Sequence, residues 1–209
     1  FSRGIARAVV DSQAWILSGG SSTGVMRMAG NAAADTRGTQ SSMTLDGQPA
    51  VGIMTLKMVK DFAKFLVKGE RVKLEKGDVP MTVMPDSNHT HFIMVNTQKA
   101  AFGLEVMFRT QLEDALCSMI PGVLVVVNGG PNTRETVLWA VRKNRAVIVI
   151  KGSGRFADEL ADKYKQHQDK KQEMRRAWEA HKQSIEEQRQ RAKANPGDVA
   201  GHPSTQSST

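Results

Sequence analysis

The sequence predicts an α/β fold with a doubly wound, mostly parallel sheet that carries helices on both faces. Short apolar segments alternate with segments of helical periodicity over most of residues 1–160, the pattern of βαβ units. Three apolar segments run into glycine turns: AWILSGGSSTG (14–24), VLVVVNGGPNT (123–133) and AVIVIKGSGR (146–155). Right-handed crossovers would bring these turns to one sheet edge, where α/β proteins hold ligands.

Periodicity and turn residues predict the elements of the amino-terminal half. Ile5 and Val9 share one face of a predicted helix over 3–12. A strand over 15–17, the first glycine loop and a short helix over 25–34 follow. The polar, turn-rich segment 35–49 predicts an exposed loop, and 50–56 predicts a strand. Residues 57–69 have helical periodicity, whereas 71–88 are typical of extended or irregular structure.

The carboxyl-terminal half has a clearer pattern. The predicted elements are a strand over 91–95, a helix over 102–120, a strand over 123–127, a helix over 133–144, a strand over 146–150 and a helix from about Phe156. Residues 123–127 are apolar at every position, which predicts a fully buried strand. The last helix should end before Asn195. It has too few apolar residues at heptad spacing to predict a coiled coil.

Composition limits the class of protein. The 209 residues are 40% hydrophobic and include a single cysteine, Cys117, which excludes an internal disulfide and fits a reducing compartment. No apolar run reaches the roughly 18–20 residues of a membrane span. The net charge is +8, but residues 163–194 hold ten Lys/Arg against five Asp/Glu, which is typical of a solvated helix rather than a nucleic-acid site. The start at Phe1 indicates a fragment of a longer chain.

Each glycine loop has a functional and a structural interpretation. SGGSSTG places hydroxyls and unpaired N–H groups at a helix amino terminus, which favours anions, although it lacks the Lys of a Walker A loop. In NGGPNT, capping by Asn132 or Thr133 explains the polar residues, while two adjacent glycines favour ligand approach. KGSGRFA resembles a dinucleotide fingerprint without the later acidic strand end, and Arg155 is suited to binding phosphate.

Other polar residues leave alternatives open. His89 and His91 are better explained as turn and strand-start residues than as a metal pair. Glu105, Arg109 and Glu113 follow one another at four-residue spacing, which is typical of an exposed ion-pair face on a helix. Alternatively, Arg109 points inward toward a phosphate. No nucleophile–base pair or paired carboxylates have persuasive spacing.

Taken in order, these motifs resemble the N-terminal domain of melastatin-type transient receptor potential (TRPM) cation channels, which belongs to the SLOG group of Rossmann-like nucleotide-ligand sensors. The matching stretches are AWILSGGSSTGVMRMAG (14–30), DSNHTHFIMV (86–95), FRTQLE (108–113), VVVNGGPNTRETV (125–137) and VIKGSGRFADEL (149–160). The resemblance implies a SLOG-type domain over 1–160 that lacks its first strand. A basic charged helix at 161–194 and a disordered tail at 195–209 would follow.

In nucleotide-sensing members of the family, ADP-ribose-like ligands lie over these loops and arginines hold the phosphates. By motif, the resemblance implies twelve ligand-binding residues: Ser18, Gly19, Gly20, Thr23, Arg109, Gly129, Gly130, Asn132, Thr133, Gly152, Ser153 and Arg155. It implies no catalytic residue, no metal and no required cofactor.

The expected function is therefore a non-enzymatic ligand-sensing or assembly domain on the cytoplasmic side of a homotetrameric channel, in contact with other domains or subunits. One alternative is a free-standing phosphoribohydrolase of the SLOG group, with Glu135 as general acid/base. Another is a structural interaction module whose basic helix, 163–194, binds an acidic partner or anionic lipid.

Overall fold

The structure of the protein is a computed structural model that describes residues 1–39, 48–69 and 82–194. Parts of the loop predicted at 35–49 and of the irregular segment predicted at 71–88, and all of the tail predicted at 195–209, lie outside the described residues. Contacts divide the chain into two compact units, residues 1–158 and 159–209.

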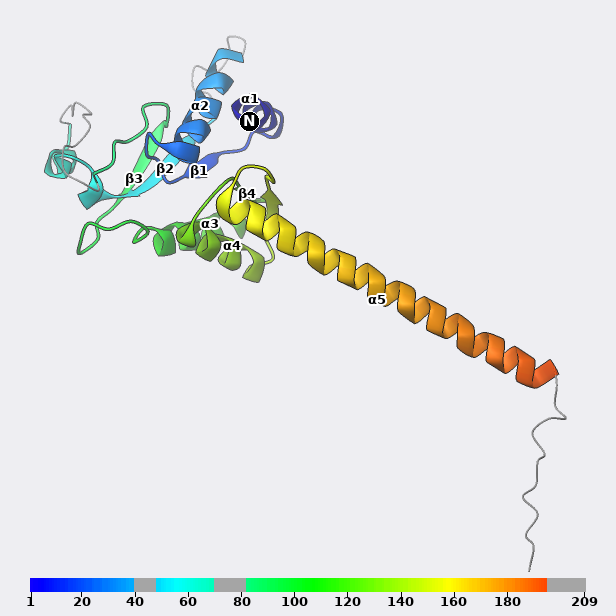
Figure 1. Cartoon of the computed structure of the whole chain (residues 1–209). Coiled ribbons are helices and arrows are strands. Elements are labelled where there is room, and N and C mark those ends of the chain that lie inside the picture. The colour runs from blue at the N-terminus through cyan, green and yellow to red at the C-terminus, as the bar shows by residue number, and fades with distance from the viewer. Residues whose placement is uncertain (40–47, 70–81, 195–209) are drawn as a thin grey trace, which may run out of the picture. The chain divides into compact units, whose positions relative to one another are not determined.

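Within the described residues, the first unit contains parallel strands in two small sheets (Figure 1). The strands are β1 (Ile16–Ser18), β2 (Ala50–Thr55), β3 (His91–Val95), β4 (Val123–Val126) and β5 (Ala146–Val149). One sheet has the order β1-β2-β3, and β4 pairs with β5 in the other. This arrangement confirms the predicted α/β class with parallel strands, although the strands are divided between two sheets.

The central strand β2 forms the core of the three-stranded sheet. Its residues pair with β1 from Ala50 and with β3 from Val51. Ile53 has no exposed surface, and Leu56, directly after the strand, is also buried. A strand that is hydrogen-bonded on both edges and covered on both faces needs apolar side chains in both directions, as the sequence of β2 provides.

Two helices, α1 (Ser2–Ser12) and α2 (Gly24–Thr39), pack against each other in the first unit. Val9 is buried on α1, which confirms the predicted helix. The predicted loop is wrong for residues 35–39, because α2 continues through them. Thr36 is fully buried, and its Oγ1 donates to the carbonyl oxygen of Ala33 at 2.7 Å. This bond satisfies the hydroxyl donor of Thr36, which allows a residue type common in turns to lie buried within the helix.

The helical periodicity after β2 produces only short turns. Two 3-10 helices, η1 (Leu56–Met58) and η2 (Phe62–Leu66), lie in this segment. Asp61 between them has a left-handed φ of +53°, which interrupts a right-handed helix. Farther along, α3 (Val106–Cys117) confirms the predicted helix in a shorter form. The turn before it contains Gly103, with φ +86°.

The two-stranded sheet is covered on one face by α4 (Pro131–Arg142), which contacts both strands. On the other face Val123, Val125 and Ile148 are exposed. The prediction of a fully buried strand over 123–127 is therefore wrong, since burial alternates along β4 and only Val126 is buried. Alternate side chains of a strand point to opposite faces, so one covering helix buries only half of them.

The last helix, α5 (Arg155–Ala194), contains 40 residues. It confirms the predicted helix from about Phe156. The predicted end before Asn195 falls at the limit of the described residues. Most of α5 belongs to the second unit, where its side chains are almost all exposed. Among the described residues, no helix combines the length and apolar character needed to cross a membrane.

Candidate ligand site at the glycine loops

The first glycine loop follows β1 and lies directly against β2. Gly20 has a φ of +68°, and a Cβ at this position would lie 2.7 Å from Cα of Gly52. A Cβ on Gly52 would in turn lie 2.7 Å from Cε1 of Phe92. Contacts this short cannot accommodate a side chain without moving backbone or ring. Two glycines therefore set how closely the loop approaches the sheet.

A hydrogen-bonded series of side chains supports the same loop. Nε2 of His89 lies 2.7 Å from Oγ of Ser18, and Nδ1 of His89 lies 3.0 Å from Oδ1 of Asp86. The Ser–His–Asp order is that of a nucleophilic triad. However, the His89 side chain has no exposed surface, and Ser18 Oγ also accepts the N–H of Gly20 at 3.0 Å. The series therefore braces the loop rather than presenting a free nucleophile.

The second loop leads from β4 into α4. Gly129 has a φ of +104°, and its N–H donates to Oδ1 of Asn128 at 2.8 Å. The N–H of Gly130 donates to Oγ1 of Thr133 at 3.2 Å. Pro131 is the first helical residue, where its missing N–H is no loss. The amino-terminal cap residue is therefore Gly130, so the prediction that Asn132 or Thr133 occupies the cap is wrong in position. Thr133 still contributes to the cap, because its Oγ1 accepts the N–H of Gly130.

The third loop is joined to the second by direct contacts. Oγ of Ser153 accepts the N–H of Asn128 at 2.8 Å and donates to the carbonyl oxygen of Ile150 at 2.5 Å. Nη2 of Arg155 lies 2.9 Å from the position of a Cβ on Gly130. The two loops thus form one surface at the carboxyl ends of β4 and β5.

Arg109, on α3, lies between the first loop and α4. Its Nη2 donates to Oγ1 of Thr136 at 3.0 Å, and its Nη1 lies 3.9 Å from the Cβ position of Gly19. Its Nε is 3.6 Å from Oε1 of Glu113, and both side chains are largely buried. Of the two alternatives for this spacing, the structure places Arg109 inward. Glu105 does not form an exposed pair either, since its Oε2 accepts Thr55 Oγ1 at 3.0 Å.

Several backbone N–H groups of the loops are already paired by nearby side chains. Besides the bonds from Gly20, Gly129 and Gly130, the N–H of Gly152 donates to Oδ1 of Asp158 at 2.7 Å. An anion at these groups must displace the present acceptors, and at Gly152 it must also displace a carboxylate. Sequence reasoning missed Asn128 and Asp158 as loop partners. Two sequence signals could have indicated these roles. Asn128 lies at a turn after an apolar segment, and Asp158 lies in the first turn of the last predicted helix.

The remaining predicted residues lie at the margins of these loops. Thr23 is exposed, and its Oγ1 lies 3.0 Å from Oγ of Ser21. Asn132 is exposed and packs against Gly103. Glu135, the alternative catalytic residue, is exposed on α4. Within the part of the chain that the structure describes, no three His, Cys, Asp or Glu residues are grouped to hold a metal ion.

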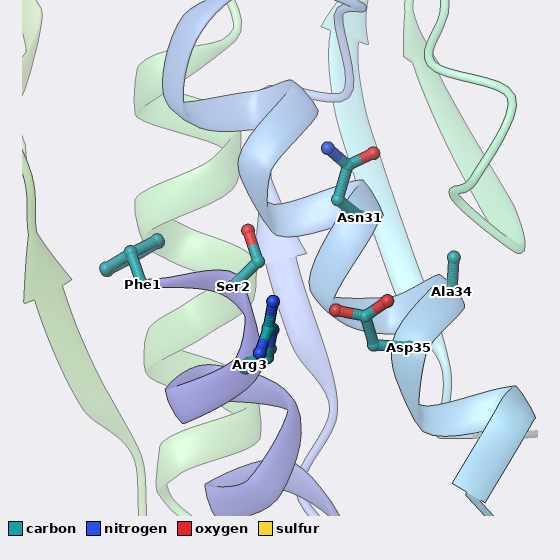
Figure 2. A pocket seen from close by; sticks show the side chains of 6 residues that line it. All are labelled: Phe1, Ser2, Arg3, Asn31, Ala34 and Asp35. Carbon is teal, nitrogen blue, oxygen red and sulfur yellow. The ribbon is translucent and has the colours of Figure 1, made fainter.

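Two hollows in the described surface lie away from the glycine loops. One, of about 600 Å³, is lined by residues at the start of the chain and on α2, which Figure 2 labels: Phe1, Ser2, Arg3, Asn31, Ala34 and Asp35. The other, of about 420 Å³, adjoins Gly122 and Arg145, at the amino ends of β4 and β5. None of the twelve predicted ligand-binding residues lines either hollow.

A parallel α/β unit with glycine loops at the carboxyl ends of its strands has the architecture of a Rossmann-like SLOG domain. The family model described as "SLOG in TRPM" matches residues 1–200, and the chain belongs to this family of TRPM channel domains. The match includes all of α5 as well as the first unit.

Relatives agree with this assignment. Transient receptor potential cation channel subfamily M member 2 of Mus musculus is 32% identical over 178 residues, which cover 77% of this chain and 12% of the relative. Subfamily M member 1 of Mus musculus is 31% identical, over 79% of this chain and 11% of the relative. The subfamily M member-like 2 protein of Nematostella vectensis is 29% identical, over 78% and 12%. The chain thus spans about an eighth of the length of these relatives.

Proposed function

We propose that this chain is a non-catalytic ligand-sensing and assembly domain of a TRPM-type cation channel, located on the cytoplasmic side of the membrane. Its ligand is a nucleotide of the ADP-ribose type, and its other partners are further domains or subunits of a homotetrameric channel. The proposal extends the family assignment, because the relatives are channels of which this chain covers about an eighth.

The observation that supports a phosphate-bearing ligand is the position of two guanidinium groups beside glycines. Arg109 lies against Gly19, and Arg155 lies against Gly130. Guanidinium binds phosphate oxygens through two parallel hydrogen bonds, and the neighbouring glycines leave the backbone open to close approach. A diphosphate would be held by one arginine at the first loop and by the other at the joined second and third loops.

Calorimetric titration of the chain with ADP-ribose tests this proposal. We expect measurable binding that weakens at least about tenfold in Arg155→Ala, because a charge-assisted hydrogen bond contributes about 1.5–3 kcal/mol. The matched control is Arg142→Ala, which removes an exposed arginine at the end of α4. It should change affinity less than about twofold, since screened surface charges contribute little. Equal losses in both variants, or no binding to the folded chain, would contradict the ligand part of the proposal.

A second candidate function is a structural interaction module whose glycine turns serve only to shape the fold. The internal pairing of the loop N–H groups favours it, because these groups need no ligand. Asp158→Asn separates the two candidates. For a nucleotide site, removing the carboxylate from Gly152 should strengthen ADP-ribose binding several-fold, since a like charge beside phosphate opposes binding. For a structural module, the substitution changes thermal stability alone.

A further inference from the structure

The second unit contains a narrow apolar stripe that nothing in the described chain covers. Four large apolar side chains between 163 and 194 are exposed: Tyr164, Met174, Trp178 and Ile185. With Tyr164 taken as position a of a heptad, Trp178 and Ile185 also occupy position a, and Met174 occupies position d. These four residues, called the seam below, include every large apolar residue of 163–194. They therefore fall on one line of the helix.

The charges beside the seam are all of one sign. Positions e and g of the same heptads carry Lys163, Lys170, Arg175, Lys182, Arg189 and Arg191, and no acidic residue. The five acidic residues of 163–194 all occupy the outer positions b, c and f: Asp169, Glu173, Glu179, Glu186 and Glu187. Some of these charges pair along the helix, as Arg175 does with Glu179 at 3.1 Å, but the charged residues on both flanks of the seam are all basic.

The same pattern opposes pairing with a second copy of this chain. In a helical pair, residues at e and g meet their counterparts on the partner, so two copies would bring lysine and arginine against lysine and arginine. Lys171 occupies an a position and in a parallel homodimer would meet its own counterpart. Carboxylates on the partner would instead neutralise both the flanks and Lys171.

From this charge segregation we propose that the seam of α5 is a docking surface for an acidic amphipathic helix of another protein or domain. The partner helix has apolar residues at a and d and Glu or Asp at e and g. The seam has few large apolar residues and contains His167 and His181 at d positions. Charge complementarity therefore supplies much of its specificity, and the pairing is expected to be reversible.

The test uses the whole chain and a fluorescent 28-residue synthetic peptide, with Leu at a and d and Glu at e and g. Fluorescence anisotropy should show saturable one-to-one binding. The triple variant K170E/R175E/K182E, which reverses three flanking charges, should lower affinity at least about tenfold, because attractive e/g pairs become repulsive. A peptide with Lys at e and g should not bind the unmodified chain and should bind this variant.

The matched control is K165E/R176E/K193E, which makes the same change of net charge at outer positions b and f. It should retain affinity within about threefold, because its charges face away from the partner. Trp178→Ala should weaken binding in the unmodified background, and circular dichroism should show unchanged helix content in all variants. Helix propensities of Lys, Arg and Glu are similar. R175E also breaks the exposed ion pair between Arg175 and Glu179, but such a pair contributes only about 0.3–0.5 kcal/mol, so the variants should keep α5 folded.

Three outcomes would overturn the proposal. Equal loss of affinity in the two triple variants would mean non-specific attraction to total charge. Concentration-dependent dimerisation of the unmodified chain that excludes the acidic peptide would assign the seam to a second copy. Binding to vesicles with 30% phosphatidylserine that is unaffected by Trp178→Ala, together with no peptide binding, would assign the basic flanks to a lipid surface.

Discussion

At the scale of single residues, the first glycine loop depends on side chains that are absent as much as on those that are present. Gly20 and Gly52 approach so closely that neither has room for a Cβ. The brace from Asp86 through His89 to Ser18 then holds the loop from the other side. The lack of Cβ atoms at the two glycines and the hydrogen bonds of the brace thus position the same short stretch of backbone.

Gly52→Ala should destabilise the chain by about 2–4 kcal/mol, because the new methyl group meets backbone of Gly20 and the ring of Phe92. Chemical denaturation followed by circular dichroism measures this change in the free energy of unfolding. Gly4→Ala is the control: it lies in α1 with nothing within 4 Å of its Cβ position. It should stabilise the chain by about 0.5–1 kcal/mol. Similar losses in both variants would contradict the steric argument.

Residue roles within the candidate site were only partly accessible from sequence. For Arg109, helical spacing leaves exposed and inward positions open, and only the resemblance to the family implies the inward one. The role of His89 was not recognised, since its partner Ser18 lies 71 positions away and no local pattern reports such a contact. Whether the twelve implied residues bind a ligand stays a prediction.

At the scale of elements, Arg145 ties α3 to the start of β5. Its Nη1 lies 2.8 Å from Oε2 of Glu113, and its Nη2 lies 2.6 Å from Oδ1 of Asp114. The arginine side chain is only 8% exposed, so these contacts are shielded from solvent. Lys143 also approaches Asp114, at 3.5 Å, but its side chain is 53% exposed.

Arg145→Ala should cost about 1.5–3 kcal/mol of stability, because it removes the shorter ion pair of two partly buried carboxylates. Among the described residues, Glu113 then keeps only Arg109, at 3.6 Å, and Asp114 keeps only the exposed Lys143. Lys143→Ala removes an exposed partner of the same Asp114 and should cost less than about 1 kcal/mol. Thermal unfolding of both variants, compared with the unmodified chain, gives the two values. A loss for Lys143→Ala as large as that for Arg145→Ala would show that burial does not determine the effect.

Elements were predictable where one local signal dominated. The strand over 91–95 agrees fully with β3, because an apolar run there is bounded by turn residues. The end of α2 was missed because Asp35, Thr36 and Gly38 are typical of turns, whereas burial of Thr36 keeps the helix intact. The burial of β4 was overestimated because sequence does not report how many strands or helices will cover it.

At the scale of the whole molecule, the two units differ in what stabilises them. The first has a buried core around β2, whereas the described part of the second is a helix whose residues are nearly all exposed. An isolated helix in water has only local interactions to hold it, such as the ion pair between Lys163 and Glu159 at 2.6 Å. Ion pairs of this exposed kind each contribute about 0.3–0.5 kcal/mol.

Hydrogen–deuterium exchange should therefore separate the units. Amides of β2 should exchange at least about a thousandfold more slowly than amides of an unfolded chain, because their exchange requires global unfolding of the first unit. Amides within 163–194 should exchange within about a hundredfold of the unfolded rate, because fraying and local unfolding expose them. Addition of the acidic peptide should slow exchange in 163–194 alone. Protection of 163–194 equal to that of β2 without peptide would show that the helix is already covered.

The internal pairing of the loop N–H groups has a consequence for the rate of any anion binding there. An incoming phosphate can reach the N–H of Gly152 only after Asp158 has released it, so the observed association rate should level off at high ligand concentration, at the rate of that release. When the ligand leaves, the same carboxylate competes for the vacated donor. A simple anion such as chloride would form too weak an interaction with the N–H of Gly152 to offset loss of the bond to Asp158. Chloride would then be excluded by binding free energy rather than by size.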